Sequence, residues 1–395
     1  MPGRDCPWPL AALLALLVTT MGTPAQALEA STAADLDGLL GRVAGILARE
    51  GVPGAGLALV DRGGTAWAGG VGTTEPGGGR AVDADTPFRV GSVSKTITAI
   101  AVMRLVEDRR LSLDATLAEA APDVPFENPW EAGRPVRVAH LLEHTAGFEF
   151  CGFNEWFDDR PEPRTLLEAL QVNPRSRRVR WPPGSRVSYS NEGYLAAGRI
   201  LERATGLPFD AAVRDLALAP LGMTSSAFQA APPLRARLAP GHGWPERPGV
   251  RVAYEDDMMR PAANLITTPR DASRLVSLFL GRGTLDGRAV LGPAAIDRME
   301  RRLTLPFAGP EEQFGIGLET FQAGGLLGFG HVGVTYGYEA AFRYLPSAGV
   351  GWAVLLNGAG SGPRRAREAI EAEILAFLSR GAPPPPVPRP APASR

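Results

Sequence analysis

Strand-like patterns lie at the two ends of this chain, and helical patterns fill the middle. Two apolar runs near the N-terminal end, residues 55–60 and 65–71, flank an Asp-Arg-Gly-Gly sequence typical of a hairpin turn. Four further runs near the C-terminal end fit strands: residues 314–321, 327–333, 338–345 and 351–356. Strands this far apart in sequence imply one sheet assembled from both ends of the chain. The pattern therefore predicts an α/β protein of the α+β type, with a helical subdomain inserted into a sheet domain.

Apolar residues recur at helical spacing in seven segments: residues 32–50, 96–103, 136–144, 165–170, 192–204, 209–218 and 364–378. We expect a single domain over residues 28–380. Its sheet part is expected at about 28–105 and 231–380, and its helical insert at about 106–230. Residues 381–395 are rich in proline and cannot build a core, so an extended or disordered tail is expected there.

The first 27 residues have the pattern of a secretory signal peptide. Arg4 supplies a weak positive charge, residues 10–18 form an unbroken apolar run, and Ala25-Gln26-Ala27 fits a cleavage site. The run is shorter than the roughly 20 residues that a membrane-spanning helix needs. The sequence therefore predicts a periplasmic or secreted protein with no stable membrane span, and an uncleaved anchor is the alternative.

The composition limits the partners of this protein. A net charge of −1 gives no electrostatic reason to bind nucleic acid or an anionic membrane. Cys151 would be the single cysteine after signal cleavage, so no internal disulfide is expected. A small-molecule substrate is the expected partner, and the sequence leaves the oligomeric state open.

The 41 lysine and arginine residues of the chain include one lysine, Lys95. Arginine stays protonated in proteins, whereas a desolvated lysine amine can lose its proton. A sequence that uses arginine wherever a cation suffices, and lysine once, indicates that Lys95 is needed as a base or proton shuttle. The alternative is that this lysine survives by chance.

Ser92 stands three positions before Lys95, at the junction of a short strand-like segment and a buried helix. Residues three apart lie on the same face of a helix. Unpaired amides and the positive dipole end at a helix N-terminus stabilise negative charge, such as the oxyanion of acyl transfer. A lysine shielded from water one turn further on is expected to take a proton from the serine more readily.

Two more elements could carry chemistry. Tyr189 and Asn191 lie on a polar loop before a predicted helix, where a phenol beside an amine can relay a proton and an amide can hold an amide-like substrate. His331-Val332-Gly333 lies on a late strand, where glycine permits close approach of a ligand. Each element alone is explained equally well by packing: a capping loop with a buried tyrosine, and a strand end with an incidental histidine.

In this order, the three elements resemble the penicillin-recognising serine hydrolases. This superfamily contains class C β-lactamases, D-alanyl-D-alanine carboxypeptidases and related esterases. The resemblance extends from about Gly51 to Leu378 and is carried by four segments: residues 88–98, 141–147, 183–191 and 330–337. It implies a mainly antiparallel sheet flanked by helices, with the site between the sheet and the helical subdomain.

The resemblance makes Ser92 the acylated nucleophile, Lys95 its partner base and Tyr189 the second acid or base. It also implies four substrate-binding positions on the walls of the site: Asn191, His331, Gly333 and Val334. The oxyanion hole of the family consists of two backbone amides, which here belong to Ser92 and Val334. No cofactor and no metal is implied.

One position departs from the family pattern. β-Lactamases and many carboxypeptidases have Lys-Thr-Gly or a close variant where this chain has His331-Val332-Gly333. The lysine of that element helps to hold a substrate carboxylate, whereas an unperturbed imidazole is mostly neutral at pH 7. Arg343 on the next strand can replace the cation only if it points into the site. The sequence therefore favours ester or D-amino-acid amide or peptide substrates, and efficient β-lactam hydrolysis is not expected.

Two alternatives stay open on the sequence alone. His140 and His144 match the H-x-x-E-H pattern of one class of zinc peptidases, although a glycine ends the predicted helix directly afterwards. The second alternative is a non-catalytic receptor for cell-wall peptides or β-lactams on the same fold. Such a receptor would be acylated at Ser92 without turnover, or not acylated at all.

Overall fold

The computed structural model describes residues 33–62, 66–156, 164–243, 249–254, 258–303 and 313–378. The predicted signal peptide and the proline-rich tail lie outside these ranges. The same holds for two residues of the predicted hairpin turn, Gly63 and Gly64.

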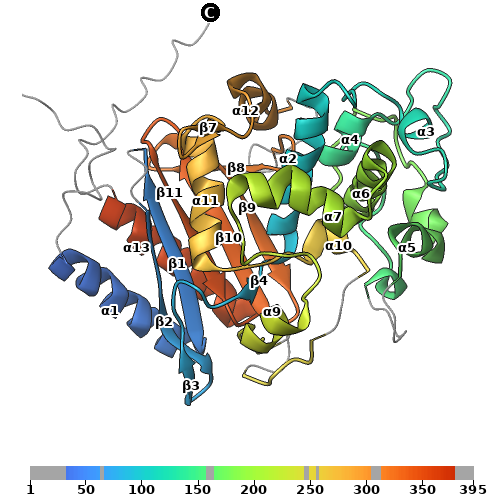
Figure 1. Cartoon of the computed structure of the whole chain (residues 1–395). Helices are drawn as coiled ribbons and strands as arrows, with labels where there is room; N and C mark the ends of the chain where they lie inside the picture. Colours follow the sequence, from blue (N-terminus) through green and yellow to red (C-terminus); the bar gives the residue numbers. More distant parts are fainter. Residues whose placement is uncertain are drawn as a thin grey trace, which may run out of the picture.

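A seven-stranded antiparallel sheet forms the centre of the molecule, in the order β3-β2-β1-β11-β10-β9-β8 (Figure 1). Its strands are β1 (Gly54–Asp61), β2 (Ala66–Glu75), β3 (Gly78–Ala81), β8 (Glu319–Ala323), β9 (Leu326–Thr335), β10 (Tyr338–Leu345) and β11 (Val350–Leu356). Strands β1 and β11 are neighbours, with Leu57 opposite Val354. The prediction of one sheet assembled from both ends of the chain is therefore confirmed.

The expected strand over residues 314–321 is shorter in the structure. Phe314 forms an isolated bridge with Glu319, and β8 begins only at Glu319. Gly317 has a φ of +67°, and a Cβ there would lie 2.5 Å from Cβ of Ala99 on the neighbouring helix. Close packing against that helix thus bends the chain where the residue pattern alone reads as extended.

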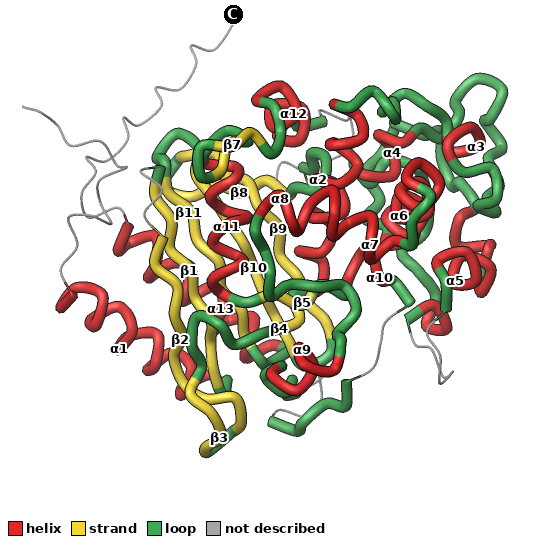
Figure 2. Tube along the Cα trace, viewed as in Figure 1, coloured by secondary structure: helices red, strands yellow, loops and turns green. Residues whose placement is uncertain are grey.

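Both faces of the sheet are covered by helices (Figure 2). Helices α1 (Ala33–Glu50) and α13 (Ser361–Leu378) pack on one face, where Leu39, Ile370 and Phe377 are buried. Helix α11 (Pro269–Leu280) packs against β1, β10 and β11 and joins the second, larger core. The sheet is therefore the middle layer of the part of the molecule that contains α1 and α13, the first and last described helices.

Most of the remaining helices lie to one side of the sheet, as Figure 1 shows. The remaining helices are α2 (Ser94–Glu107), α3 (Leu117–Ala120), α4 (Val138–Leu142), α5 (Leu166–Val172), α6 (Asn191–Thr205), α7 (Phe209–Val213), α8 (Ala219–Leu221), α9 (Pro232–Arg237), α10 (Arg260–Ala263) and α12 (Pro293–Glu300). Single turns are η2 (Gly91–Val93), η3 (Phe153–Glu155), η4 (Pro174–Arg177) and η5 (Arg214–Leu218). Short strand pairs are β4 (Phe88–Arg89) with β5 (Ile266–Thr267), and β6 (Thr284–Leu285) with β7 (Arg288–Ala289). The expected boundary of the helical insert near residue 230 stays a prediction.

Helix α2 is buried on every side, which explains its apolar sequence. The hydroxyls of its two buried threonines have hydrogen-bond partners on other segments. Thr96 donates to the carbonyl of Gly317, and Thr98 donates to the carbonyl of Pro261. Helices α6 and α10 pack against it. The first turn of α2 is therefore held between the sheet and the helical side of the molecule.

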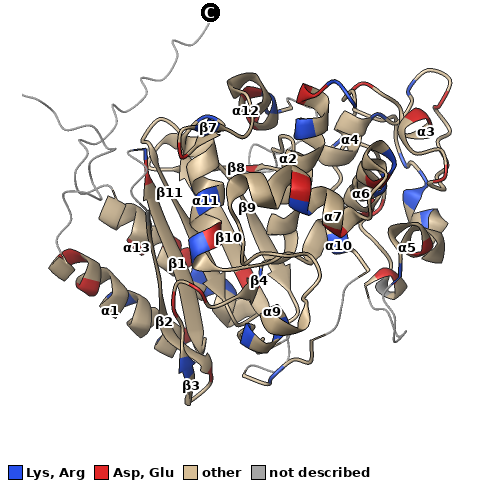
Figure 3. Ribbon diagram, in the orientation of Figure 1, with Lys and Arg blue, Asp and Glu red and all other residues tan. Residues whose placement is uncertain are grey.

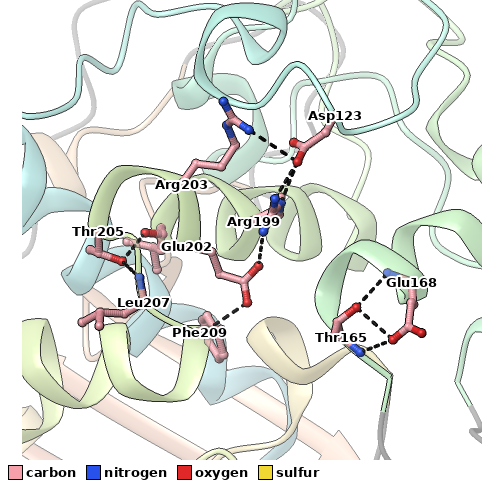
Figure 4. A network of polar contacts seen from close by, with 10 residues as sticks. Asp123, Thr165, Glu168, Arg199, Glu202, Arg203, Thr205, Leu207 and Phe209 are labelled. Atoms are coloured by element: carbon pink, nitrogen blue, oxygen red, sulfur yellow. Dashed lines mark hydrogen bonds and ion pairs between the residues drawn. The ribbon is translucent and has the colours of Figure 1, made fainter.

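Helix α6 is fixed at its far end by a polar network (Figure 4). Arg199 donates to Asp123 at 2.6 Å and to Glu202 at 2.8 Å, while Glu202 accepts the backbone amide of Phe209 at 3.1 Å. Pairs as exposed as these contribute little to stability individually. Their joint effect is to fix the orientation of the helix whose first residue is Asn191.

Lysine and arginine positions alternate with aspartate and glutamate positions along the ribbon in Figure 3. This mixture agrees with the net charge of −1. Among the helices that the structure describes, none combines the length and the hydropathy needed to cross a membrane.

Candidate active site

Ser92 lies on the single turn η2, between β4 and helix α2. The sequence placed it at the helix N-terminus, and the structure adds this tight turn in front of the helix. Gly91 has a φ of +50°, which few side chains tolerate. The hydroxyl of Ser94 donates to the carbonyl of Gly91 and accepts the amide of Leu265 at 2.9 Å, so the turn is fixed from inside. The Ser92 side chain itself is only half-buried.

Lys95 is completely buried, and its amine contacts three oxygens. Nζ lies 3.0 Å from Oγ of Ser92, 2.7 Å from Oδ1 of Asn191 and 3.0 Å from the carbonyl oxygen of Ala262. The last two oxygens can only accept hydrogen bonds. A neutral amine has two N–H groups for those two acceptors, and its lone pair then faces the Ser92 hydroxyl. The geometry is therefore the one in which Lys95 can remove the serine proton.

Tyr189 completes the immediate surroundings of Ser92. Nζ of Lys95 lies 4.8 Å from the centroid of its ring, and the ring stacks on His144 at a centroid distance of 4.2 Å. Withdrawal of the phenol from water raises the pKa of Tyr189, although a hydrogen bond with Ser92 acts in the opposite direction. The resting phenol is consequently neutral, and it can donate its proton to a leaving group.

Asn191 is positioned by the start of helix α6. The Ser190 side chain caps this helix by accepting the amide of Gly193 at 3.2 Å. Asn191 then presents Oδ1 to Lys95, and its Nδ2 lies 3.7 Å from Sγ of Cys151. The predicted lone cysteine thus lies beside the site, in contact with a residue that contacts the lysine.

Strand β9 brings the remaining predicted residues to the same place. A Cβ at Gly333 would lie 1.9 Å from the carbonyl oxygen of Val90 and 2.9 Å from the amide nitrogen of Ser92. The amide of Val332 donates to Glu319 on the β8 side of the strand, and strand amides alternate in direction every residue. The Val334 amide therefore points to that same side, while the Val334 backbone lies against Gly91. This arrangement suits an oxyanion hole formed by Ser92 and Val334.

We expect Gly333→Ala to lower kcat/KM by about 10- to 100-fold, because a shift of the order of 1 Å at the reacting groups has an effect of that size. The added methyl group must displace the backbone of Val90 or of β9. Overpacking of this kind also costs about 1–3 kcal/mol of stability. Steady-state kinetics and thermal unfolding measure the two effects. Gly78→Ala is the matched control, because a Cβ there meets no atom within 4 Å. Unchanged activity in Gly333→Ala would contradict the predicted position of the oxyanion hole.

His331 is buried, with 1% of its surface exposed, and its ring centroid lies 6.4 Å from that of Tyr189. Burial lowers the pKa of its imidazole, although the Glu319 carboxylate acts in the opposite direction. A neutral His331 offers no charge to a substrate carboxylate. Arg343 does not replace it, because its guanidinium contacts Glu371 on α13 and lies over the Phe321 ring.

Three features of the site were not predicted from the sequence. His144 supports Tyr189 by stacking, and its Nδ1 accepts the amide of Ser190. Glu319 lies beside His331, although no motif marks it. An aromatic group, formed by Phe150, Trp156 and Tyr336, extends from Tyr189 with centroid distances of about 6 Å between neighbours. The resemblance covered the segments that contain His144 and Tyr336 without giving either residue a role, and His144 was considered only as a possible zinc ligand.

The geometry disfavours the zinc alternative. Helix α4 ends at Leu142, and His144 has a φ of +57°, so His140 and His144 do not share a helical face. Nδ1 of His140 accepts the amide of Arg137, whereas the His144 ring lies among Tyr189, Tyr194 and Phe314. In the described parts of the chain, no three histidine, cysteine, aspartate or glutamate residues form a group that could hold a metal.

Two cavities of about 160 and 300 Å³ are lined by described residues, the first beside the start of α13 and the second between Tyr254 and Tyr338. Neither of these two is lined by Ser92, Lys95 or Tyr189. The contacts around the buried Lys95 amine identify the site.

Comparison with known proteins agrees with this site. A family model described as Beta-lactamase matches residues 39–376. Penicillin-binding protein 4 of Amycolatopsis lactamdurans is 32% identical over 320 residues, which cover 78% of this chain and 81% of that protein. Esterase EstB of Burkholderia gladioli is 34% identical over 190 residues, which cover 45% of this chain and 47% of the esterase.

Among solved structures, the octameric penicillin-binding protein homologue from Pyrococcus abyssi superposes with a TM-score of 0.72 at 25% identity. The superposition covers 88% of this chain and 79% of the homologue. The resemblance inferred from the three sequence elements is therefore confirmed. The chain belongs to the Beta-lactamase family, and the relatives that it resembles in sequence include a penicillin-binding protein and an esterase.

Proposed function

We propose that this protein is an exported serine hydrolase that cleaves a small ester or a D-amino-acid amide or peptide through an acyl-enzyme on Ser92. The observation that carries the proposal is the contact of the buried Lys95 amine with Oγ of Ser92 at 3.0 Å. Two carbonyl acceptors orient that amine so that its lone pair faces the serine. Export rests on the predicted signal peptide.

In the first half-reaction, Lys95 takes the proton of Ser92 while Oγ attacks the substrate carbonyl. The amides of Ser92 and Val334 stabilise the oxyanion that forms. Tyr189 then gives its proton to the departing alcohol or amine and regains one from the Lys95 ammonium. In the second half-reaction, water adds to the acyl carbonyl and releases Ser92.

The side chains around Ser92 favour an apolar substrate that carries no carboxylate at the His331 position. Four large apolar side chains in the described ranges are exposed, and two of them, Phe150 at 47% and Val334 at 38%, lie next to the predicted catalytic residues. Burial keeps His331 neutral, and Arg343 points to the other side of the sheet. We therefore expect aryl or alkyl esters to be better substrates than a cephalosporin, whose carboxylate finds no cation at this position.

Labelling with a fluorophosphonate tests the proposed nucleophile. Intact mass should show one adduct per chain, and peptide mapping should place it on Ser92. Turnover of p-nitrophenyl esters or D-amino-acid amides by the same enzyme preparation would establish hydrolysis. Labelling at another residue would refute the proposal, and an acylated Ser92 without turnover would favour the receptor alternative.

We expect Phe150→Ala to change substrate preference more than overall activity. The exposed Phe150 ring lies 6.2 Å from the Tyr189 ring, so it can cover an apolar acyl group bound at Ser92. Loss of an aromatic contact of this kind costs roughly 1–2 kcal/mol. The ratio of kcat/KM for p-nitrophenyl phenylacetate to that for p-nitrophenyl acetate should fall about 5- to 30-fold.

The matched control for Phe150→Ala is Leu207→Ala, another exposed apolar residue, in the turn that follows helix α6. This control should leave the ratio unchanged. An unchanged ratio in Phe150→Ala itself would show that the acyl group binds elsewhere.

A further inference from the structure

Glu319 and His331 form a carboxylate–imidazole pair directly behind the proposed acid or base Tyr189. Oε1 of Glu319 lies 3.3 Å from Nδ1 of His331, and Oε2 accepts the amide of Val332 at 3.1 Å. The two residues come from neighbouring strands, because Glu319 begins β8 and His331 lies on β9. The backbone amide of Val332 thus fixes the carboxylate that contacts the histidine.

The neighbours of Nδ1 determine the tautomer of His331. Nδ1 lies 2.6 Å from the carbonyl oxygen of Val332 in addition to the Glu319 contact. A carbonyl oxygen and a carboxylate oxygen can only accept, so Nδ1 must carry the proton. In neutral His331 the other nitrogen, Nε2, is therefore an unprotonated acceptor.

Nε2 of His331 is buried and finds no hydrogen-bond partner among the described residues. An unpaired buried acceptor is costly and needs an explanation. The Tyr189 ring lies 6.4 Å away between centroids, and the hydroxyl at the end of a phenol extends well beyond its ring. For Tyr189 to donate to Nε2, its hydroxyl would have to move from Ser92 towards this nitrogen.

We propose that Glu319 and His331 form a proton relay through which Tyr189 activates the water of the second half-reaction. The inference rests on the proposed acyl-enzyme function and deepens it. Water gives one proton to the Tyr189 oxygen, the phenol passes its own proton to Nε2, and the resulting hydroxide adds to the acyl carbonyl. The imidazolium then returns the proton through Tyr189 to Oγ of Ser92 as the acyl group leaves. No atom or electron is left over.

Neutral Tyr189 makes such a relay necessary. A protonated phenol cannot accept a proton from water without releasing its own, and desolvation raises the pKa of Tyr189 so that phenolate is not available at rest. Lys95 serves the first half-reaction, because its amine faces Oγ of Ser92. The Tyr189 ring lies beside His331 on β9, with 6.4 Å between the ring centroids, so these two residues are available for the second half-reaction.

The charges around His331 explain why Glu319 is required. Lys95 and Arg343 oppose protonation of the imidazole, and burial acts in the same direction. His144, which is kept neutral by burial, and Tyr189 add no compensating charge. Glu319 favours the imidazolium most strongly, and the hydrogen bond with the Val332 carbonyl acts in the same direction. Glu319 is therefore a positioning residue whose carboxylate both sets the tautomer and stabilises the protonated ring.

Nitrogen NMR tests the tautomer without any substrate. The chain has four histidines, His140, His144, His242 and His331. Nδ1 of His140 and of His144 accepts a backbone amide, so both should be protonated on Nε2. A long-range ¹H–¹⁵N spectrum should show His331 in the opposite form, protonated on Nδ1. Glu319→Gln should lower the pH at which His331 titrates, because it removes the one charge that raises the pKa of this imidazole.

Burst kinetics test the role in the second half-reaction. With p-nitrophenyl acetate, Glu319→Gln and His331→Gln should release the first equivalent of p-nitrophenol within a few-fold of the wild-type rate. Steady-state turnover should then fall about 10- to 100-fold, and an acetyl adduct on Ser92 should accumulate in the intact mass. In a Tyr189→Phe background, Glu319→Gln should have little further effect, because the relay acts through the phenol.

The matched control is Glu75→Gln, because Glu75 contacts His242 at 3.1 Å in a second carboxylate–imidazole pair remote from Tyr189. It should leave the burst and the turnover unchanged. The relay is refuted if His331 is protonated on Nε2, or if Glu319→Gln slows acylation and deacylation equally. Absence of any acylation in the wild type would refute the proposed function instead, and the tautomer measurement would still stand.

Discussion

Ser92→Ala is expected to lower kcat/KM by about 10⁴- to 10⁶-fold, the size of effect that follows removal of a catalytic nucleophile. The acyl-enzyme cannot form without Oγ, and the remaining activity would come only from binding and from the amides of the oxyanion hole. The measurement is ester hydrolysis by variant and wild type at equal concentration. Fluorophosphonate labelling should disappear in the same variant.

The fold should tolerate the Ser92→Ala change. Ser92 is half-buried, and its turn is held by the hydroxyl of Ser94 rather than by its own. A thermal unfolding midpoint close to that of the wild type is therefore expected. Ser185→Ala is the control, because that hydroxyl only closes a local turn by donating to Pro182. Activity within ten-fold of wild type in Ser92→Ala would rule out a serine acyl-enzyme at this position.

Lys95→Arg is expected to lower kcat/KM by about 10²- to 10⁴-fold, the usual contribution of a general base. A guanidinium keeps the positive charge but cannot lose its proton at neutral pH, so it cannot accept the proton of Ser92. It is also planar and larger than the amine that fits between Ser92, Asn191 and Ala262. Single-turnover kinetics should show that acylation itself is slowed.

A second variant separates loss of the base from a failure to fold. Lys95→Gln can still donate to the carbonyl groups of Asn191 and Ala262 but has no base to offer. Both variants should therefore unfold cooperatively and lose turnover, with circular dichroism spectra similar to that of the wild type. Near-normal rates in folded Lys95→Arg would show that charge, rather than proton transfer, is what the lysine supplies.

The sequence predicted some parts of the fold better than others. One sheet built from both ends of the chain followed from the strand patterns there, because an isolated strand cannot satisfy its backbone; the pairing of β1 with β11 came from the structure. The start of β8 was predicted five residues too early, since the residues around Gly317 look extended but bend to pack against Ala99. Local pattern gives the type of an element, and close contacts with distant residues set its ends.

The same distinction holds for the site. Ser92 and Lys95 are three residues apart on a helical turn, so their contact follows from helix geometry once the helix is recognised. Tyr189 and Asn191 lie about a hundred residues further on, and only the resemblance to a family suggested that they belong with Lys95. Their structure-derived distances agree with that suggestion, and their catalytic roles stay predictions until the variants are measured.

The contact between Glu319 and His331 could not be predicted from any sequence pattern. It stands in an unremarkable stretch, and its relation to His331 arises because β8 is hydrogen-bonded to β9 in one particular register, with Glu319 opposite Gly330. The stacking of His144 on Tyr189 has a similar origin, because a left-handed residue after helix α4 meets a loop that precedes helix α6.

The sequence by itself determined that both ends of the chain contribute strands to one sheet, that the helix after Ser92 is buried, and that a serine pairs with a single lysine one turn later, because these depend on local periodicity and on the chemistry of individual residues. The tertiary structure alone decided which oxygens surround the Lys95 amine, which way Arg343 points and which nitrogen of His331 is free. Those properties depend on distances between segments far apart in the chain, and strand register and helix packing fix such distances.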